Sequence, residues 1–331
     1  MIQTEKSREA FWRSIIINRK KRGDEMVWNV KDLNQRVQDQ DSRMWISQVE
    51  AEARLNRKNL AARIARNPEI RFLMIAGPSS SGKTTFARLL SEELNTFGIH
   101  AHHIGIDDYY FDRQDVPLDE EGNRDFECPE AIDSVLFNRD MLSLMNGKEI
   151  RIPRLNFITG HREDSGKTLR LRKKELLIIE GIHGLIDKLS ESLPVQNKFK
   201  IFLCPQLSVN TGEDILNGTD VRLMRRIIRD DRTRGTSAAR TIDMWKSVRR
   251  GEKKYIFPYI FGVDAQADTS LAYEIHALKP YLLPCLTAIK SDDEEAYRTS
   301  ERLIRLLDSF EGRVPLEDIP EDSLLREFVG K

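Results

Sequence analysis

A short glycine- and serine-rich stretch, residues 77–84, carries the residues with the most specific chemistry. It reads Gly-Pro-Ser-Ser-Ser-Gly-Lys-Thr and fits G-x-x-x-x-G-K-[ST], a pattern whose backbone N–H groups surround phosphate oxygens. In this pattern Lys83 reaches the β- and γ-phosphates of a nucleotide, and the hydroxyl of Thr84 ligates Mg²⁺. We therefore expect this phosphate loop to bind ATP or GTP together with Mg²⁺. The expected nucleotide-binding residues are Gly77, Ser79, Ser80, Ser81, Gly82, Lys83, Thr84 and Thr85.

The residues on either side of the phosphate loop predict a strand and a helix. The apolar run 72–76 has the length of a buried parallel strand. After the loop, Phe86, Leu89, Leu90 and Leu94 recur at helical spacing, so a helix should begin at the loop. The N-terminus of a helix offers unpaired N–H groups and partial positive charge, which stabilise a bound anion. This context favours a phosphate site over a chance glycine-serine turn.

Strand and helix patterns then alternate along the chain. Further strands are expected at 102–106, 176–179 and 199–203, and a helix is expected at 132–145. This alternation predicts an α/β fold with a parallel sheet covered by helices on both faces. Ligands of such sheets bind beyond the carboxyl ends of the strands. The phosphate loop and two acidic residues, Asp107 and Glu180, should therefore meet in one crevice.

These two acidic residues are candidates for catalytic chemistry. Asp107 follows the second expected strand and is the candidate general base for a hydroxyl group. Glu180 ends the third expected strand and could hold Mg²⁺ together with Thr84. The structural alternatives are a turn or helix cap for Asp107 and a plain strand-end glutamate for Glu180.

A helix rich in arginine is expected in the second half of the chain. Arg222, Arg225, Arg226 and Arg229 share one of its faces. Guanidinium groups bind phosphate in bidentate geometry, and clustered arginines repel one another unless an anion lies among them. We therefore expect a lid at about 218–250 that closes over phosphate, with Arg225 and Arg229 stabilising the transferred phosphoryl group. A solvated or salt-bridged helix face is the alternative.

The overall composition restricts the location and partners of the protein. Across 331 residues, 53 basic residues balance 53 acidic ones, so we expect neither nucleic acid nor a membrane surface as partner. The three cysteines are widely spaced, which argues against a disulfide framework or zinc site and favours a reducing compartment. The N-terminus lacks a signal-peptide pattern, and no apolar run has membrane-spanning length. We therefore expect a cytoplasmic protein.

Three segments are expected along the chain. Residues 1–68 form a polar, helical N-terminal segment with a basic end, residues 69–290 form the phosphate-binding domain with its lid, and residues 291–331 form a C-terminal helix and an acidic tail. The tail after Glu311 is expected to be loosely attached.

With these motifs in place, the chain resembles the uridine kinase/phosphoribulokinase family of P-loop kinases from Ile70 to Ala288. It is most similar to a bacterial nucleoside-kinase branch in which the kinase-like domain follows a connector, here residues 1–68. Asp-Asp-Tyr-Tyr at 107–110 resembles D-x-[FY]-[FY], whose first aspartate is the base in that family. The other matching segments are 77–85, 125–131, 153–157 with Arg162, 180–182 and 220–226.

The resemblance implies a P-loop NTPase-type fold and an ATP- and Mg²⁺-dependent kinase. The acceptor that it implies is a small molecule, a nucleoside or a related sugar-containing compound, and members of the family are often homo-oligomers. The residues that it implies for binding the acceptor are Tyr109, Glu127, Arg162 and Arg222.

The chain departs from the family pattern at the residues that read the base of a pyrimidine nucleoside. Leu155 stands where such kinases have a tyrosine, and Gly160 stands where they have a histidine. Neither replacement can make the lost hydrogen bonds. Glu127 replaces an aspartate that binds ribose hydroxyls. Two alternatives therefore stay open: a kinase of a phosphosugar or pantothenate-like acceptor, and a nucleotide-binding regulator without catalysis.

Overall fold

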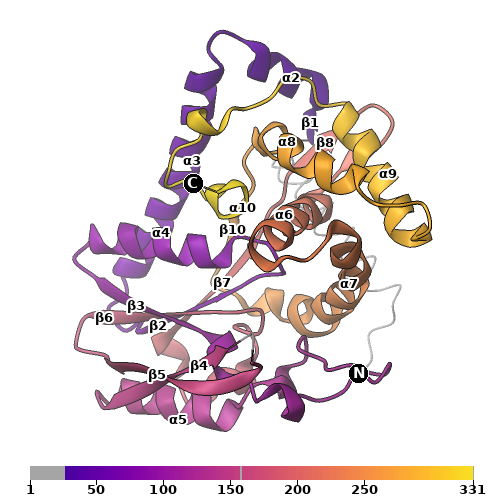
Figure 1. The fold of residues 1–331 in the computed structure, drawn as a ribbon. Coiled ribbons are helices and arrows are strands. Elements are labelled where there is room, and N and C mark those ends of the chain that lie inside the picture. The colour runs from indigo at the N-terminus through magenta and orange to yellow at the C-terminus, as the bar shows by residue number, and fades with distance from the viewer. Residues whose placement is uncertain (1–26, 157–158, 331) are drawn as a thin grey trace.

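The structure is a computed structural model that describes residues 27–156 and 159–330. Its centre is a five-stranded sheet in the order β10-β7-β2-β6-β3, in which all neighbouring strands are parallel (Figure 1). The expected α/β fold is confirmed. The strands are β2 (Phe72–Ala76), β3 (His100–Gly105), β6 (Glu175–Glu180), β7 (Lys198–Cys204) and β10 (Ala265–Asp268).

Strand β2 lies in the middle of the sheet and is buried along its whole length. Its side chains alternate between two apolar layers, as successive residues of a strand must. On one side Leu73 and Ile75 pack in the layer that contains Leu90 of α4 (Lys83–Asn95). On the other side Phe72 and Met74 pack in the layer that contains α5 (Ser134–Met145). Helices therefore cover both faces, which explains why β2 is apolar without interruption.

Strand β3 ends earlier than the sequence suggested. The strand stops at Gly105, and residues Ile106–Tyr109 form a 3-10 turn. Asp107 therefore lies in a turn immediately beyond the strand. The expected helix at 132–145 begins two residues later, at Ser134, because the side chain of Asp133 accepts a hydrogen bond from the N–H of Leu136 and caps the helix.

The arginine-rich region forms two consecutive helices. These are α6 (Gly218–Arg234) and α7 (Ala238–Gly251). Asn217 and Asp220 form a capping box at the start of α6, and Gly235 ends it in the left-handed conformation with φ 61°. These features fix where α6 begins and ends.

The remaining elements surround this centre. An antiparallel hairpin consists of β4 (Glu149–Asn156) and β5 (His161–Arg170), and it lies next to the turn that carries Asp107. A small sheet combines β1 (Val27–Asn29), β8 (Ser208–Asn210) and β9 (Ile215–Leu216). The other helices are α2 (Val30–Gln38), α3 (Ser42–Ala65), α8 (Glu274–Thr287), α9 (Glu294–Asp308) and α10 (Arg326–Val329).

The expected helical N-terminal segment is confirmed for its described part, whereas residues 1–26 lie outside the described residues. Helix α3 packs along α4, and α2 joins the C-terminal part of the chain (Figure 1). The amide of Asn34 donates to the carbonyl of Ser309 at 2.9 Å. The two ends of the described chain therefore pack on the same side of the central sheet.

The C-terminal tail is firmly packed, so the expectation of loose attachment is wrong. Leu325 and Phe328 are fully buried, and the guanidinium carbon of Arg225 lies 5.1 Å from the centre of the Phe328 ring. The acidic composition suggested a solvated tail, but the apolar residues between the acidic ones face the core. No helix in the described part of the chain is long and apolar enough to cross a bilayer.

We expect Phe328→Ala to lower the free energy of unfolding by about 3–5 kcal/mol, because it removes a fully buried aromatic side chain. Urea unfolding measures the change. Phe97→Ala is the matched control, since Phe97 is 41% exposed and should change stability by only about 0.5 kcal/mol. Equal effects of the two substitutions would contradict the packed tail.

Candidate active site

A cavity of about 380 Å³ lies at the carboxyl ends of the central strands. The phosphate loop follows β2, Asp107 follows β3 and Glu180 ends β6, and these three strands are neighbours in the sheet. The structure therefore brings the three predicted pieces to one edge of the sheet. The cavity is lined by the loop on one side and by residues of the hairpin, Tyr110 and Glu127 on the other.

The phosphate loop has the backbone shape of an anion-binding concavity. Ser80 and Gly82 adopt positive φ angles of 58° and 83°, and such left-handed residues turn successive N–H groups toward one point. A side chain at Gly77 would lie 2.2 Å from the carbonyl oxygen of Leu203, so only glycine fits there. The hydroxyls of Ser80 and Ser81 are buried without a hydrogen-bond partner among the described residues. Phosphate oxygens would supply the missing partners.

Lys83 is held at the loop itself. Its Nζ donates to the carbonyl oxygens of Gly77 at 3.0 Å and Pro78 at 3.2 Å. Burial lowers the pKa of Lys83, while the nearby carboxylates of Glu180 and Asp107 act in the opposite direction. The ammonium group would exchange the loop carbonyls for phosphate oxygens when a nucleotide binds.

Thr84 and Glu180 form a direct pair. The hydroxyl of Thr84 donates to Oε1 of Glu180 at 2.7 Å. Oxygen donors of this kind suit Mg²⁺, which usually keeps several waters and takes phosphate oxygens as further ligands. In the described ranges no three His, Cys, Asp or Glu residues cluster as a metal cage. Thr84 and Glu180 could therefore hold this ion.

Asp107 has the electrostatic environment of a proton acceptor. Burial raises its pKa to about 6, with a further upward contribution from Glu180, while Lys83 opposes the shift. Its neighbour Asp108 has a different task, because its carboxylate accepts the backbone N–H of Leu155 at 3.3 Å and ties the turn to the hairpin. Of the two aspartates, Asp107 is the one that lines the cavity.

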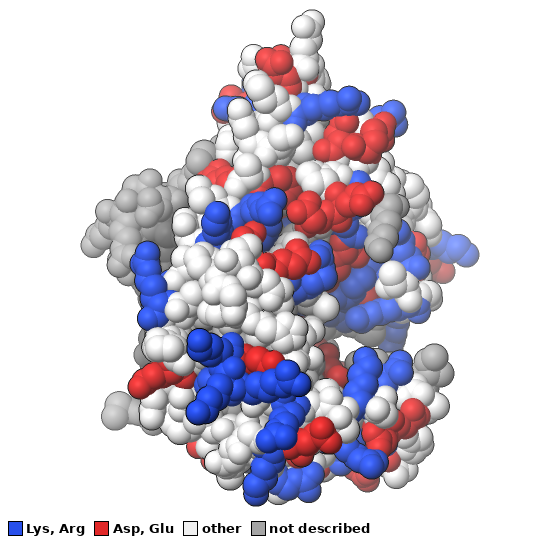
Figure 2. Space-filling view, turned by 90° about the vertical axis from the view of Figure 1, so that its left-hand side faces the viewer, with Lys and Arg blue, Asp and Glu red and all other residues white. Residues whose placement is uncertain are grey.

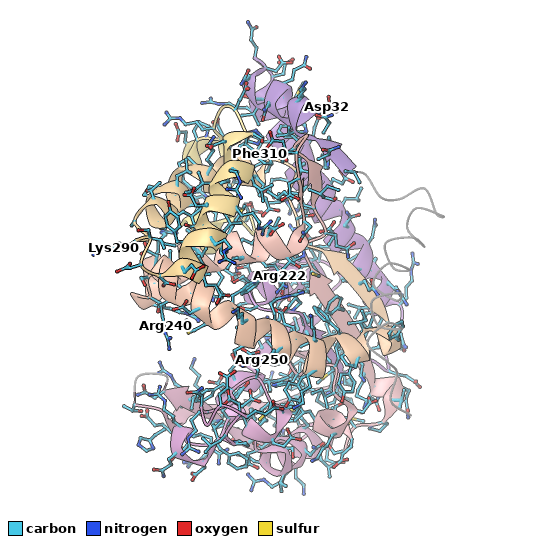
Figure 3. All side chains as sticks on the ribbon, turned by 90° about the vertical axis from the view of Figure 1, so that its right-hand side faces the viewer. Asp32, Arg222, Arg240, Arg250, Lys290 and Phe310 are labelled. Carbon is cyan, nitrogen blue, oxygen red and sulfur yellow. The ribbon has the colours of Figure 1, made fainter. Side chains whose placement is uncertain are left out.

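The arginine face of α6 divides into two parts. Arg226 and Arg229 line the cavity, joined by Arg234, and Arg226 donates to the hydroxyl of Ser79 at 2.6 Å. Arg222 and Arg225 are not among the residues that line the cavity, and each is fully buried in an ion pair. Arg222, which Figure 3 labels, also donates to the carbonyl oxygen of Ser79 in the phosphate loop at 3.2 Å. Arg222 pairs with Glu252 at 3.0 Å, and Arg225 pairs with Glu274 at 2.8 Å.

The expected functional roles of Arg222 and Arg225 are therefore not supported by their positions in the structure. Both guanidinium groups have structural partners that neutralise them inside the protein. The spacing of the arginines in the sequence identified the correct helix face. It could not show which of these arginines would meet an acidic side chain from a later helix. Arg226 and Arg234 are two cavity residues to which the sequence analysis assigned no individual role, and both belong to the arginine cluster that drew attention to the helix.

Two expected acceptor residues also lie elsewhere. Tyr109 is fully buried in the core and its hydroxyl donates to Asp140 at 3.3 Å, whereas the next residue, Tyr110, lines the cavity. Tyr110 was missed because the chain turns at this point instead of continuing as a strand. Arg162 is bound to Asp133 at 3.1 Å and does not belong to the cavity lining.

Glu127 lines the cavity as expected. Burial raises its pKa to about 7, and the guanidinium group of Arg226 opposes this shift. The Cβ of Glu127 packs directly against Gly251 at the end of α7, where any larger residue would collide with it. This side of the cavity is therefore in contact with the end of α7.

The two residues that depart from the family pattern, Leu155 and Gly160, also line the cavity. Leu155 contributes an apolar side chain, and Gly160 has a positive φ of 76°. A side chain at Gly160 would come within 2.9 Å of Arg113, which itself lines the cavity. The glycine thus makes room for an arginine in the cavity wall.

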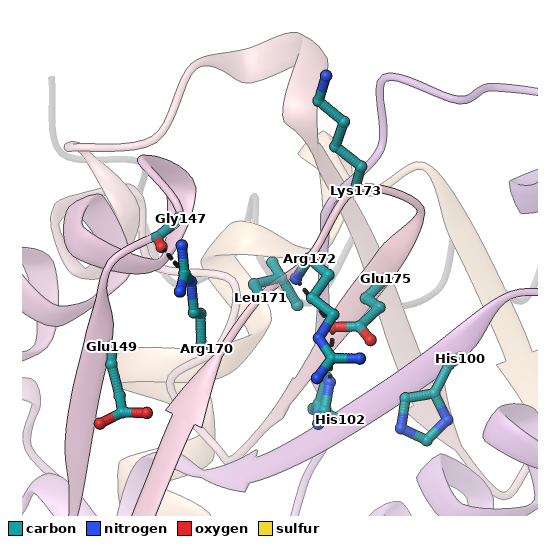
Figure 4. A pocket seen from close by; sticks show the side chains of 9 residues that line it. All are labelled: His100, His102, Gly147, Glu149, Arg170, Leu171, Arg172, Lys173 and Glu175. Carbon is teal, nitrogen blue, oxygen red and sulfur yellow. Dashed lines mark hydrogen bonds and ion pairs between the residues drawn. The ribbon is translucent and has the colours of Figure 1, made fainter.

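A second cavity, of about 840 Å³, lies where β3 and β6 begin, and its residues include His102, Arg172 and Glu175 (Figure 4). Figure 2 shows this side of the molecule, where Lys and Arg side chains gather in the lower half. Within the cavity, Nε2 of His102 lies 3.1 Å from Oε2 of Glu175, which is hydrogen-bond distance. The cavity lies at the end of the strands opposite to the phosphate loop, and ligands of parallel sheets bind at the carboxyl end.

A known protein family matches the part of the chain that forms most of this site. The family model described as "Phosphoribulokinase / Uridine kinase family" matches residues 72–269, which contain the phosphate loop, Asp107, Glu180 and α6. The chain belongs to this family.

Individual members of the phosphoribulokinase/uridine kinase family are similar over about half of the chain. A uridine kinase from Proteus mirabilis is 32% identical over 188 residues, which cover 56% of this chain and 80% of that protein. A uridine kinase from Ligilactobacillus salivarius is 34% identical over 176 residues, which cover 52% of this chain and 72% of that protein. A solved structure of a possible uridine kinase from Bacillus stearothermophilus has 19% identity and a TM-score of 0.40, over 60% of this chain and 89% of that chain.

We expect Arg225→Ala to lower the free energy of unfolding by about 3–5 kcal/mol, because Glu274 would keep a buried charge without its partner. Chemical denaturation measures this change. Arg298→Ala serves as the control, since Arg298 is 77% exposed and its pair with Glu294 should contribute about 0.5 kcal/mol or less. If both variants lose equally little stability, Arg225 has no structural role.

Proposed function

We propose that this chain is an ATP- and Mg²⁺-dependent kinase that transfers the γ-phosphoryl group to a hydroxyl of a small molecule. The observation that carries the proposal is one cavity that combines a phosphate-binding loop with a buried carboxylate of raised pKa. Phosphoryl transfer needs mainly positioning and charge neutralisation, and this cavity offers residues for both. The proposed kinase domain comprises residues 69–290.

The donor half is proposed to work through the loop and α6. The N–H groups of the loop and Lys83 neutralise the β- and γ-phosphates, and Thr84 and Glu180 hold Mg²⁺, which stabilises charge on the phosphate oxygens when bound. Arg226, Arg229 and Arg234 face the same cavity and supply positive charge for the transferred group. GTP would fit the same residues, because these residues are proposed to bind the phosphate groups that ATP and GTP share.

The acceptor half is proposed to work through Asp107. Its carboxylate accepts the proton of the attacking hydroxyl, which then bonds to the γ-phosphorus while ADP leaves. A carboxyl group with a pKa of about 6 is mostly ionised at neutral pH, yet it is a stronger base than an ordinary aspartate. Glu127 would hold a second hydroxyl of the acceptor.

A nucleoside is the first acceptor class that we propose, because the named relatives are uridine kinases. Leu155, Gly160 and Arg113 favour an alternative. The guanidinium group of Arg113 suits an acceptor with a negative charge, such as a phosphosugar or a pantothenate-like acid, whereas Leu155 and Gly160 offer no side-chain hydrogen bond to a base. A regulator that binds nucleotide without transfer is the remaining alternative.

A panel of nucleosides, phosphosugars and hydroxy acids, tested with ATP and Mg²⁺, separates these possibilities. ADP release that depends on one acceptor, with a phosphorylated product of the expected mass, supports the kinase. Tight nucleotide binding without acceptor-dependent turnover supports the regulator.

We expect Asp107→Asn to reduce kcat by about 10²–10⁴-fold, since an amide cannot accept the proton. Asp108→Asn is the matched control, because its amide oxygen can still accept the N–H of Leu155. Steady-state turnover with the best acceptor measures both. Near-normal turnover of Asp107→Asn would exclude Asp107 as the base.

We expect kcat/KM to rise with pH to a plateau, with a midpoint at about 6, because Asp107 must lose its proton to act. Below this midpoint the rate should fall about tenfold per pH unit. The Glu127→Gln variant should show the same fall in kcat/KM at low pH, because it leaves Asp107 in place. A flat profile between about pH 5 and 8 would contradict the assignment.

A further inference from the structure

The C-terminal segment, residues 323–330, reaches the phosphate loop although it lies outside the part of the chain that matches the family. A side chain built at Gly82 of the loop would lie 2.7 Å from a methyl carbon of Leu324. Arg232 of α6 donates a hydrogen bond to the carbonyl oxygen of Phe328. The segment therefore connects the phosphate loop to the lid helix.

Further contacts fix this segment in place. The side chain of Arg326 donates to the carbonyl oxygens of Leu316 at 2.9 Å and Pro320 at 3.2 Å. The hydroxyl of Ser323 binds the carboxylate of Glu50 on α3. Together with the buried side chains of Leu325 and Phe328, these bonds hold the segment in one position.

Glu327 is the one residue of this segment whose side chain lines the cavity. The hydroxyl of Thr85, in the first turn of α4, donates to Oε2 of Glu327 at 2.7 Å. Burial lowers the pKa of Lys83 and of Arg234, and the negative charge of Glu327 is among the charges that raise both pKa values. A carboxylate thus stands beside the helix end where the phosphates bind.

We propose that Glu327 belongs to the donor site and that its carboxylate accepts hydrogen bonds from the sugar hydroxyls of the bound nucleotide. The proposal rests on the proposed use of a nucleoside triphosphate by the phosphate loop. A carboxylate repels phosphate, so its partner in this place must be a hydrogen-bond donor or a cation. An ionised carboxylate has about four acceptor positions, and Thr85 uses one of them.

The order of the chemical groups in a nucleotide supports the sugar hydroxyls as the partner of Glu327. Lys83 and Thr84 are proposed to bind the phosphates that end the molecule, and Thr85 is the next residue along α4. The sugar is the next part of the nucleotide after its phosphates. Its two neighbouring hydroxyls match the two oxygens of a carboxylate, as in other nucleotide-binding folds where an acidic side chain binds the ribose.

Nucleotide affinity tests this proposal independently of phosphoryl transfer. Isothermal titration calorimetry with the full chain would compare Mg²⁺–ATP with Mg²⁺–2′,3′-dideoxy-ATP, which lacks both sugar hydroxyls, for wild type and Glu327→Gln. We expect dideoxy-ATP to bind wild type about tenfold more weakly than ATP. We expect this ratio to fall to about threefold in Glu327→Gln, because its amide keeps one neutral acceptor oxygen in place of two charged ones. Glu321→Gln is the control, because Glu321 is an exposed carboxylate of the same tail, and it should keep the wild-type ratio.

The other outcomes of this experiment overturn the proposal. An unchanged ratio in Glu327→Gln, with both nucleotides weaker by the same factor, means that Glu327 only supports the loop. A gain in affinity for both nucleotides, seen equally with Mg²⁺–tripolyphosphate, means that Glu327 only repels phosphate. Thermal unfolding of each variant confirms that it is folded. A wild-type chain that binds no nucleotide overturns both proposals, whereas the expected ratios without acceptor turnover contradict only the kinase.

Discussion

The arrangement of charges at the carboxyl end of the sheet is the constraint on which the rest of the site depends. Lys83 lies in the phosphate loop after β2, Asp107 follows β3 and Glu180 ends β6, and these three strands are neighbours in the sheet. Buried charges are costly unless opposite charges or hydrogen bonds accompany them. Burial lowers the pKa of Lys83 and raises that of Asp107, while each opposes the shift of the other. The parallel sheet supplies this closeness, because its strands all end on the same side.

The arginines of helix α6 also need opposite charges or hydrogen bonds wherever they are buried. Its four closely spaced arginines divide according to the partners that they find. Arg222 and Arg225 face inward and are neutralised by Glu252 and Glu274, so they join α6 to the helical elements that follow it. Arg226 and Arg229 lie on the cavity side, next to the phosphate loop. One helix thus serves both as a structural support and as a source of positive charge for the site.

The sequence predicted the parts of this structure that depend on neighbouring residues in the chain. The central strand at 72–76, the loop and the sheet type follow from short patterns whose physical causes are local. The role of Arg225 depended on Glu274, 49 positions later, and the side chain of Tyr109 turned inward because a 3-10 turn replaced the end of a strand. The attachment of the tail depended on Phe328 meeting Arg225 and on Leu324 meeting Gly82. Contacts between residues so far apart in the chain leave no pattern in the local spacing of residue types.

The central claim is that a phosphate donor and a hydroxyl acceptor meet in one cavity between the phosphate loop and Asp107. The most direct test uses ATP with ¹⁸O in its γ-phosphoryl group and follows the label by mass spectrometry in a single turnover. The account predicts that the labelled phosphoryl group appears as a phosphate ester on a hydroxyl of the acceptor. Label found only in inorganic phosphate, with every acceptor tested, would contradict it.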